Sequence, residues 1–243
     1  MRKLLLLLYL AGSVSCAQEI EIPENLQTDE SRQFLKTDEG KNLLANAKEK
    51  ALAEMRLYQN DPALREYFDF YRQGNYNAAF QSIEPVAMAG HAQAQAELAS
   101  LYLNGKGVPV DVDLAIKWLE KSSAQGNLMA TSTLGGIYYV PNLGRQDFDK
   151  SYEYNEKCAL LLRYSCLVPY ANLQAVEGFT HYDLVKAAAW YEIAVDQDAP
   201  GASLNQNAVL SQLTKEQLAQ VKVEKRNALA LIEKRMKQKA LAK

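Results

Sequence analysis

The chain has 243 residues, with 27 lysines and arginines against 29 aspartates and glutamates, which gives a formal net charge of −2. This slightly acidic balance argues against a nucleic-acid partner, because surfaces that bind nucleic acids carry an excess of positive charge. The sequence also lacks a glycine-rich phosphate loop, a nucleophile elbow and any zinc-ligand spacing. We therefore expect no enzyme activity, no cofactor and no metal site.

Residues 1–17 have the pattern of a signal peptide. A positive start is followed by the apolar run 4–10 and by small residues up to Ala17. The apolar run is too short to span a membrane as a helix, so no transmembrane segment is expected. An ordinary buried N-terminal helix is the alternative to export.

Two processing routes fit these residues. Cleavage after Ala17 follows the small-x-small rule and leaves Gln18 as the first residue of a periplasmic chain. Acylation of Cys16 would instead give an outer-membrane lipoprotein with a lipid anchor, although Ser13 stands where such signals usually have leucine. The sequence leaves both routes open.

Residues 18–57 are predicted to form an N-terminal arm and a capping helix. The stretch up to Gln27 is polar and acidic, and a helical rhythm of apolar residues follows from Thr28. Gly40 weakens that rhythm in the middle, so one kinked helix and two shorter helices both fit. We expect this segment to cover the open end of a helical stack.

The best-formed segment of the chain is 94–126, which contains two helical patterns joined by a turn. Gly105 and Gly107 end the first pattern, because glycine adopts a positive φ without steric cost. Asp111 or Asp113 can cap the second helix with its side chain. One unit of this kind cannot bury its apolar stripe alone and must stack on a copy of itself.

Degraded copies of this segment recur at a spacing of 36 residues. Small residues recur where helices must approach closely, and bulky aromatic residues recur where a gap must be filled. The capping position recurs as Asp111, Asp147 and Asp183, which we interpret as helix caps rather than as a catalytic carboxylate pair. The copies extend over 58–205, and a C-terminal capping helix with a basic tail follows at 206–243.

The expected fold is therefore all-α. It is a right-handed α/α superhelix, or solenoid, of about four helix-turn-helix repeats of 36 residues with N- and C-terminal capping helices. At the start of the last helix, Thr214 and Gln217 have the spacing of a capping box.

The motif of residues 94–126 resembles the Sel-one-like repeat, the α/α relative of the tetratricopeptide repeat. The match is close except for Ala99, which stands in the usual place of a glycine. The next unit replaces the glycine-rich turn with residues 141–144, and the last full unit has residues 176–179 there. The resemblance implies an adaptor or scaffold that binds a protein or peptide.

Export would remove or lipidate Cys16 and leave two cysteines, Cys158 and Cys166, in the chain. They replace Ser122 and Ala130 of the preceding unit, two small inward positions that should face each other across a tight turn. This geometry suits a disulfide, and the C-x7-C spacing is similar to that of the secreted, cysteine-rich branch of the family. Two free thiols that pack as small apolar side chains are the alternative.

The candidate binding residues fall into two groups. On the first helices of the repeats, polar residues outside the apolar stripe are expected to line a concave groove: Gln93, Glu97, Ser100, Thr133 and Asn172. At the irregular turns 140–146 and 176–182, aromatic residues break the smooth surface and are candidates for partner specificity: Tyr139, Phe148, Phe179 and Tyr182. The two histidines have plainer expected roles: His91 caps a helix or contacts solvent, and His181 faces solvent.

The expected function is that of a non-enzymatic protein–protein interaction module of the bacterial cell envelope, which binds a protein or peptide on its concave face. Two alternatives come from other classes. Immunity proteins that neutralise toxins of type VI secretion systems are among the exported proteins that this chain resembles. Some cysteine-rich relatives are β-lactam-hydrolysing enzymes, but the chain has neither a Ser-x-x-Lys motif nor a zinc cluster to support that activity.

Overall fold

The computed structural model describes residues 37–38, 41–42, 45, 61–199 and 201–241. The predicted signal peptide, Cys16 and most of the predicted N-terminal arm and capping helix therefore lie outside the described residues. Ten α-helices lie between residues 61 and 241, and this part of the chain contains no strand. The prediction of an all-α fold is confirmed.

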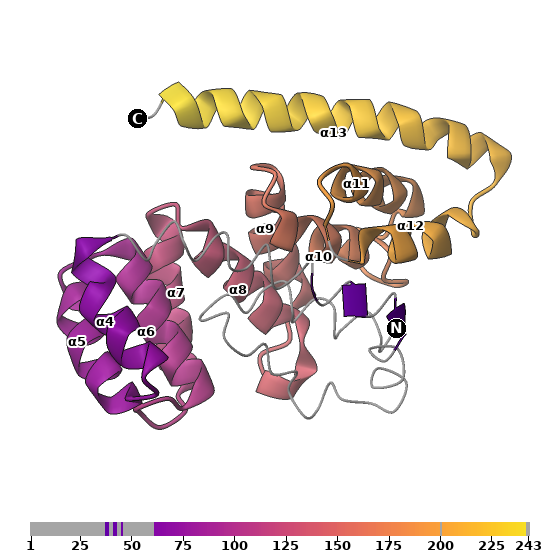
Figure 1. The fold of residues 1–243 in the computed structure, drawn as a ribbon. Helices are drawn as coiled ribbons and strands as arrows, with labels where there is room; N and C mark the ends of the chain where they lie inside the picture. The colour runs from indigo at the N-terminus through magenta and orange to yellow at the C-terminus, as the bar shows by residue number, and fades with distance from the viewer. Residues whose placement is uncertain (1–36, 39–40, 43–44, 46–60, 200, 242–243) are drawn as a thin grey trace. The chain divides into compact units, whose positions relative to one another are not determined.

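In chain order the α-helices are α4 (Arg65–Arg72), α5 (Tyr76–Met88), α6 (Ala92–Asn104), α7 (Val112–Ala124), α8 (Leu128–Tyr139), α9 (Phe148–Ala159), α10 (Tyr164–Gln174), α11 (Leu184–Asp196), α12 (Ala202–Leu210) and α13 (Lys215–Leu241) (Figure 1). Two short 3-10 helices are also present in this part of the chain: η2 (Pro62–Leu64) precedes α4, and η3 (Pro141–Leu143) lies between α8 and α9.

The helix boundaries repeat with the period that the sequence predicts. The first helices α6, α8 and α10 begin at positions 92, 128 and 164, and the second helices α5, α7, α9 and α11 begin at 76, 112, 148 and 184. Successive starts in each series are 36 residues apart. The chain is therefore an α-helical repeat protein of the solenoid kind, while the right-handed sense of the superhelix stays a prediction.

Each second helix begins with the same side-chain cap. The capping carboxylates of Asp111, Asp147 and Asp183 accept hydrogen bonds from backbone N–H groups of the first turn at 2.8–3.0 Å. Asn75 caps α5 in the same way through its side-chain oxygen. These bonds satisfy N–H groups that a helix start leaves without partners. The predicted role of the recurring aspartates as helix caps is confirmed.

The same aspartates also close the turns that precede them. The backbone N–H groups of Asp111, Asp147 and Asp183 donate to the carbonyl oxygens of the residues nine positions earlier, at 3.1, 2.8 and 2.8 Å. Three turns of different sequence thus share one closing hydrogen bond. A regular and an irregular turn therefore start and end at equivalent points of the repeat.

The described residues divide into two compact units, whose main parts are 61–134 and 135–241. In the first unit, α4 packs on α5, α5 on α6 and α6 on α7, and these helices lie side by side in Figure 1. Their core is formed by fully buried large side chains from α4, α5 and α6, among them Tyr67, Ile83 and Leu98. Gly107 in the turn after α6 lies so close to α5 that an added Cβ would be 2.2 Å from the carbonyl oxygen of Tyr76.

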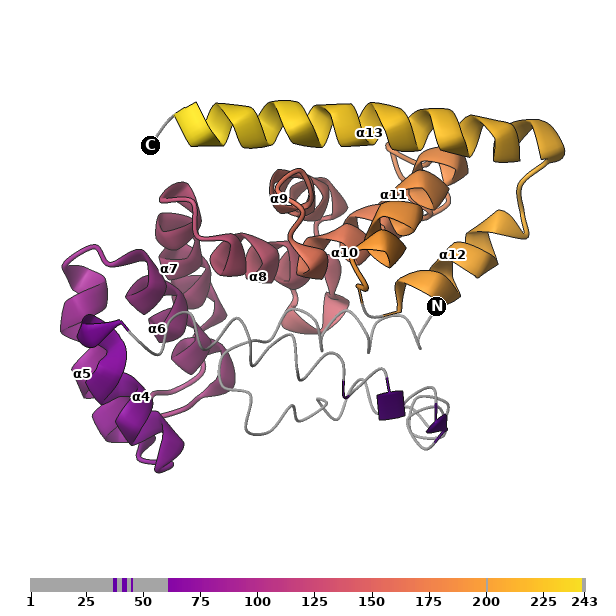
Figure 2. The ribbon, with the colours of Figure 1, turned by 45° about the horizontal axis from the view of Figure 1, so that its top comes forward.

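In the second unit, α9 packs on α10, α10 on α11, and α11 on both α12 and α13 (Figure 2). The predicted capping box is present at the start of α13, where Thr214 and Gln217 exchange two hydrogen bonds at 2.9 and 3.2 Å. Three residues of α13, Val221, Ala228 and Ile232, are buried. The basic end of α13 beyond Ile232 is exposed, as far as the described residues reach.

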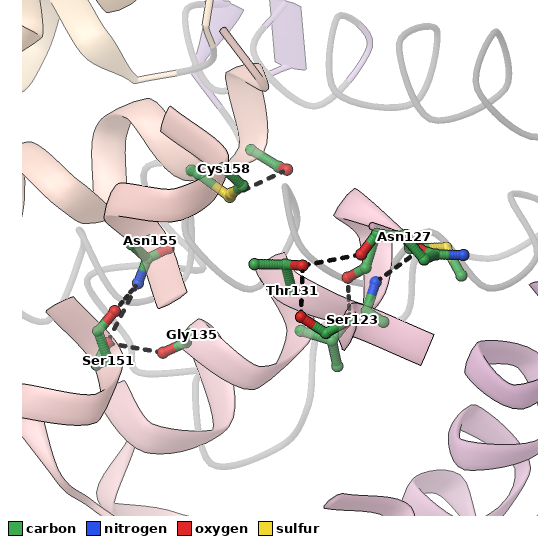
Figure 3. The surroundings of a disulfide bond; sticks show 12 residues. Ser123, Asn127, Thr131, Gly135, Ser151, Asn155 and Cys158 are labelled. Atoms are coloured by element: carbon green, nitrogen blue, oxygen red, sulfur yellow. Dashed lines mark hydrogen bonds between the residues drawn. A yellow bond between two sulfur atoms is a disulfide. The ribbon is translucent and has the colours of Figure 1, made fainter. Parts of the chain in front are cut away.

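Cys158 at the end of α9 and Cys166 in α10 form a disulfide, with their Cα atoms 5.9 Å apart (Figure 3). Both residues are fully buried. In the same unit, the Ser151 hydroxyl donates to the Gly135 carbonyl at 2.7 Å, and the Asn155 amide donates to the Ser151 carbonyl at 2.9 Å. The bridge that the repeat register predicts between Ser122-like and Ala130-like positions is thus present.

Loss of this disulfide is expected to weaken the second unit. For a loop closed over a separation of 8 residues, the chain-entropy model gives a loss of about 2.5 kcal/mol in the free energy of unfolding. Urea unfolding of a Cys158→Ser, Cys166→Ser variant, compared with the oxidised protein, measures this loss. Equal midpoints for the two proteins would contradict the expectation.

Candidate functional site

Polar side chains of the first unit form a buried network around Glu97. The Tyr67 hydroxyl of α4 donates to Glu97 Oε2 at 2.9 Å, and Gln93 Nε2 donates to Glu97 Oε1 at 2.8 Å. Asn127 Nδ2 in turn donates to Gln93 Oε1 at 2.9 Å. The network therefore connects α4, α6 and the junction before α8.

Burial raises the pKa of the Glu97 carboxyl in this network. Glu97 is 3% exposed, and the desolvation of its charged form raises the pKa of the carboxyl from 4.5 to about 7. The hydrogen bonds from Gln93 and Tyr67 act in the opposite direction but do not offset the desolvation. Glu97 therefore carries a buried carboxyl that titrates near neutral pH.

The predicted groove residues do not share one environment. Gln93, Glu97 and Asn172 are at most 5% exposed, so their side chains are buried rather than facing solvent. Ser100 and Thr133 are partly exposed. Thr133 donates its hydroxyl to the Met129 carbonyl at 2.9 Å. The role of these five residues in binding a partner stays a prediction.

The two irregular turns bring their aromatic residues together in the second unit. We call the group formed by Tyr139, Phe148, Tyr152, Phe179 and His181 the turn cluster. Ring centroids are 5.8 Å apart for Tyr139 and Phe148, 5.9 Å for Phe148 and Phe179, and 5.3 Å for Phe179 and His181. The rings of Tyr152 and His181 are stacked, with centroids 4.0 Å apart and planes within 5°. These distances are typical of favourable aromatic pairs.

The turn cluster has a polar support on its inner side. The Tyr152 hydroxyl lies 2.9 Å from the hydroxyl of buried Tyr170, which donates to Glu156 Oε1 at 2.9 Å. Burial raises the pKa of Tyr170 and of Tyr152, and it raises the pKa of Tyr139 to about 12. These hydroxyls stay protonated at neutral pH, so they can form hydrogen bonds but cannot act as bases.

The outer side of the turn cluster is open to solvent. Tyr139, Phe148 and Phe179 are partly exposed and His181 is exposed. Tyr182 next to His181 is 43% exposed and takes part in no ring contact among those found in the described residues. The structure thus brings together three of the four aromatic residues that the irregular turns predict.

Two members of the turn cluster were not expected from the sequence. Tyr152 lies in the second helix α9 and has no mark that distinguishes it from the other aromatic residues of the repeats. His181 is exposed as predicted, but its stacking on Tyr152 was not expected from the sequence.

His91 caps α6 in the first unit. Its Nδ1 accepts a hydrogen bond from the Ala94 N–H at 3.2 Å, and its Nε2 lies 2.9 Å from Asp61 Oδ2.

In the described part of the chain, no group of three or more histidine, cysteine, aspartate and glutamate residues could hold a metal ion. No described helix is long and apolar enough to cross a membrane.

Comparison with family models agrees with the repeat architecture. The family model described as the Sel1 repeat matches residues 92–127 and 177–198. A comparison with curated proteins finds no match. Among solved structures, the chain is similar to a protective antigen present in uropathogenic Escherichia coli strains, described as displaying an SLR fold.

That structure is 20% identical to the chain, with a TM-score of 0.39, over 81% of this chain and 51% of the other. The chain therefore spans about half the length of that protein. The stretch 92–127 matched by the family model holds α6 and α7, and the stretch 177–198 holds α11 and the irregular turn before it. The family model thus identifies two Sel1 repeats in the chain, and the helix period of 36 residues agrees with their positions.

Proposed function

We propose that the chain is a non-enzymatic protein-binding module of the bacterial cell envelope, and that it holds a protein or peptide partner at the turn cluster. Sel1 repeats are protein–protein interaction modules, which supports protein binding as the general function. The observation that carries the proposal is the convergence of both irregular turns on one partly exposed aromatic surface. A solenoid built only for stability would not need this departure from its own repeat.

The geometry of the turn cluster suits a binding surface. Aromatic side chains are enriched among the residues that contribute most to protein–protein affinity, because they bury a large area with few rotatable bonds. Both irregular turns are closed by the same backbone hydrogen bond as the regular turn, so the aromatic residues stand on a fixed base. Binding residues on loops that a rigid scaffold positions are a common arrangement.

The concave face of the repeats is the other candidate surface. Of the five residues predicted to line it, Ser100 and Thr133 are partly exposed. Both are small and polar, and neither offers the contact area of an aromatic residue. We therefore place the main contact at the turn cluster and treat these two residues as secondary candidates.

The proposed location in the envelope has two supports. Residues 1–17 have the pattern of a signal peptide, and disulfides such as Cys158–Cys166 persist in oxidising compartments. The mass of the N-terminal peptide of the mature protein separates an acylated Cys16 from a free Gln18. An intact Met1 in the mature protein would contradict export.

Site-specific cross-linking tests the proposed binding surface. We expect benzoylphenylalanine at position 182, beside the turn cluster, to cross-link one envelope protein upon irradiation of cells. The matched control is the same residue at position 110, because Val110 is 61% exposed and lies in the regular turn of the first unit.

The identity of the cross-linked protein distinguishes a toxin-neutralising protein from a general adaptor. A secreted toxin would identify the neutralising function, and any other protein would identify an adaptor. Equal cross-linking at positions 182 and 110, or none at 182 together with hydrolysis of a β-lactam by the purified chain, would contradict the proposal.

A further inference from the structure

The turn cluster is bordered by negative charge on α9. Phe148 and Tyr152 contribute their rings to the cluster from this helix. Asp149 and Glu156 lie three and four residues from Tyr152, and residues at these spacings are neighbours on a helix surface. Glu153 lies between the two acids on the same face, and we call Asp149, Glu153 and Glu156 the acidic stripe. Asp149 and Glu153 are exposed, and Glu156 is partly exposed.

Hydrogen bonds hold one carboxylate of the acidic stripe beside the turn cluster. The Tyr152 hydroxyl lies 2.9 Å from the hydroxyl of Tyr170, which donates to Glu156 Oε1 at 2.9 Å. Two hydrogen bonds therefore connect this carboxylate to a ring of the cluster. Because Tyr170 is buried, the position of the carboxylate relative to the rings is fixed.

Within the described residues, no ion pair neutralises the acidic stripe. The two lysines of α9 lie over rings outside the turn cluster. Lys150 Nζ is 4.9 Å from the ring centroid of Tyr138, and Lys157 Nζ is 5.0 Å from that of Tyr154. The irregular turns add one charge of each sign: Glu177 and Arg145. The surface of α9 beside the cluster is therefore negative.

The negative face departs from the repeat, as the aromatic rings do. One period earlier, α7 carries Asp113, Lys117 and Glu120 at the positions of the acidic stripe. Glu153 thus replaces Lys117 with the opposite charge. The two positions from which α9 contributes rings to the cluster hold aliphatic residues in α7. Like charges four residues apart are unfavourable in a helix, so helix stability does not explain why the rings and the added negative charge occur in the same unit.

Negative charge beside exposed aromatic rings is suited to a cation. Ring faces attract cations, and a carboxylate adds a charge-assisted hydrogen bond. A phosphate or carboxylate ligand would be repelled, and an apolar side chain would leave the acidic stripe without a partner. Lys121 of the first unit lies over the ring of Trp118, 4.2 Å from its centroid. Among the described residues, by contrast, no lysine or arginine lies over a ring of the turn cluster.

We propose that the turn cluster and the acidic stripe together bind an arginine side chain of the protein partner. The guanidinium stacks on the exposed rings, and its N–H groups donate to the carboxylate oxygens of Asp149 and Glu153. Arginine fits this surface better than lysine, because its guanidinium is planar, weakly hydrated and matched to carboxylates in geometry. This inference rests on the proposed function and adds to it the chemistry of the partner segment, which is basic.

Short peptides test this specificity without the natural partner. Acetyl-Gly-Arg-Gly-amide carries the guanidinium, the same peptide with citrulline keeps its shape without the charge, and the peptide with leucine keeps only apolar bulk. In titrations of the full-length, isotope-labelled protein at low ionic strength, we expect the arginine peptide to shift the ring resonances of Phe179 and His181 saturably. The other two peptides should bind roughly fivefold more weakly, because they lose the cation–π contact and the ion pair. The indole of Trp118, which Lys121 already covers, is the matched control and should not shift.

Variants with neutralised carboxylates give a second readout. Asp149→Asn with Glu153→Gln should weaken binding of the arginine peptide roughly threefold and leave binding of the citrulline peptide unchanged. The matched control is Asp113→Asn with Glu120→Gln, which changes the net charge by the same amount at two exposed positions of α7. This control should bind the arginine peptide like the wild type.

Equal affinities for the arginine and citrulline peptides, tighter binding of the leucine peptide, or no saturable shift at the cluster would overturn the inference. Equal losses of affinity in the two double variants would also overturn it, because they would indicate an effect of net charge alone. A partner captured by cross-linking at position 182, together with equal affinities for the arginine and citrulline peptides, would keep the proposed function and reject this inference alone.

Discussion

Replacing Gly107 by alanine is expected to destabilise the first unit by about 3 kcal/mol, combining the cost of a positive φ with that of forcing an atom into a packed contact. Gly107 has a φ of 76°, and a Cβ there would meet the Tyr76 carbonyl oxygen at 2.2 Å and its carbon at 2.6 Å. Both contacts are backbone atoms, which cannot rotate away. The start of α5 must therefore move away from the turn after α6.

The matched control is Gly126→Ala. Gly126 has a φ of 84°, but nothing lies within 4 Å of its added Cβ, so only the conformational cost of about 1 kcal/mol is expected. Urea unfolding measured by fluorescence in a Trp190→Phe background leaves Trp118 as the reporter of the first unit. Equal losses in the free energy of unfolding for the two variants would show that the contact with Tyr76 does not contribute to the cost of the Gly107→Ala substitution.

The stability of the first unit is expected to fall as the pH rises from 4.5 to 7, because the folded protein holds a proton on Glu97 that the unfolded chain has already lost. The raised pKa of about 7, against 4.5 for an ordinary glutamate, corresponds to a total loss of about 3 kcal/mol. The sign follows from linkage: in this interval the folded state binds more protons than the unfolded state, so a higher pH favours unfolding. The contribution of Glu97 is complete below pH 4.5 and absent above pH 7.

Glu97→Gln should remove this pH dependence, because a carboxamide stays neutral while it can still bond to Gln93 and Tyr67. Glu120→Gln on the exposed side of α7 is the control and should keep the wild-type profile. The measurement is the free energy of unfolding in urea between pH 4 and pH 8. A Glu97→Gln profile that runs parallel to that of the wild type would refute the assignment.

The fold could be predicted in most of its elements because its signals are local and repeated. Asp111, Asp147 and Asp183 share one residue type, one spacing and one local hydrogen bond, so each capped helix start follows from a few adjacent residues. The same register placed Cys158 and Cys166 opposite each other, and the structure joins them. No long-range information was needed for these predictions.

The burial of the predicted groove residues could not be predicted from the repeat pattern, because it depends on side chains that are distant in the sequence. Periodicity gives the side of its own helix on which Glu97 lies, but it says nothing about which distant side chain covers that side. Tyr67 does so from a helix 30 residues away, and Asn205 does so for Asn172 from 33 residues away. Residues that the pattern placed on a solvent-facing surface are therefore buried.

The turn cluster could be predicted in part from the sequence. Both irregular turns could be recognised because their sequences depart from the repeat. Phe179 lies within the turn 176–182, and Tyr139 and Phe148 flank the turn 140–146. Tyr152 was missed because an aromatic residue in a second helix fits the ordinary repeat. His181 was assigned to solvent, and its stacking on Tyr152 depends on the exact path of the turn, which the sequence pattern does not give.

The affinity of the cross-linked partner for a Phe179→Ser variant tests the central claim most directly. Phe179 contacts Phe148, Tyr152 and His181, so its loss removes the middle of the turn cluster. By calorimetry with purified proteins, we predict a dissociation constant at least roughly 30-fold above that of the wild type, as for an aromatic residue central to an interface. Val110→Ser should bind like the wild type. A Phe179→Ser protein that is folded and binds its partner with unchanged affinity would contradict the account.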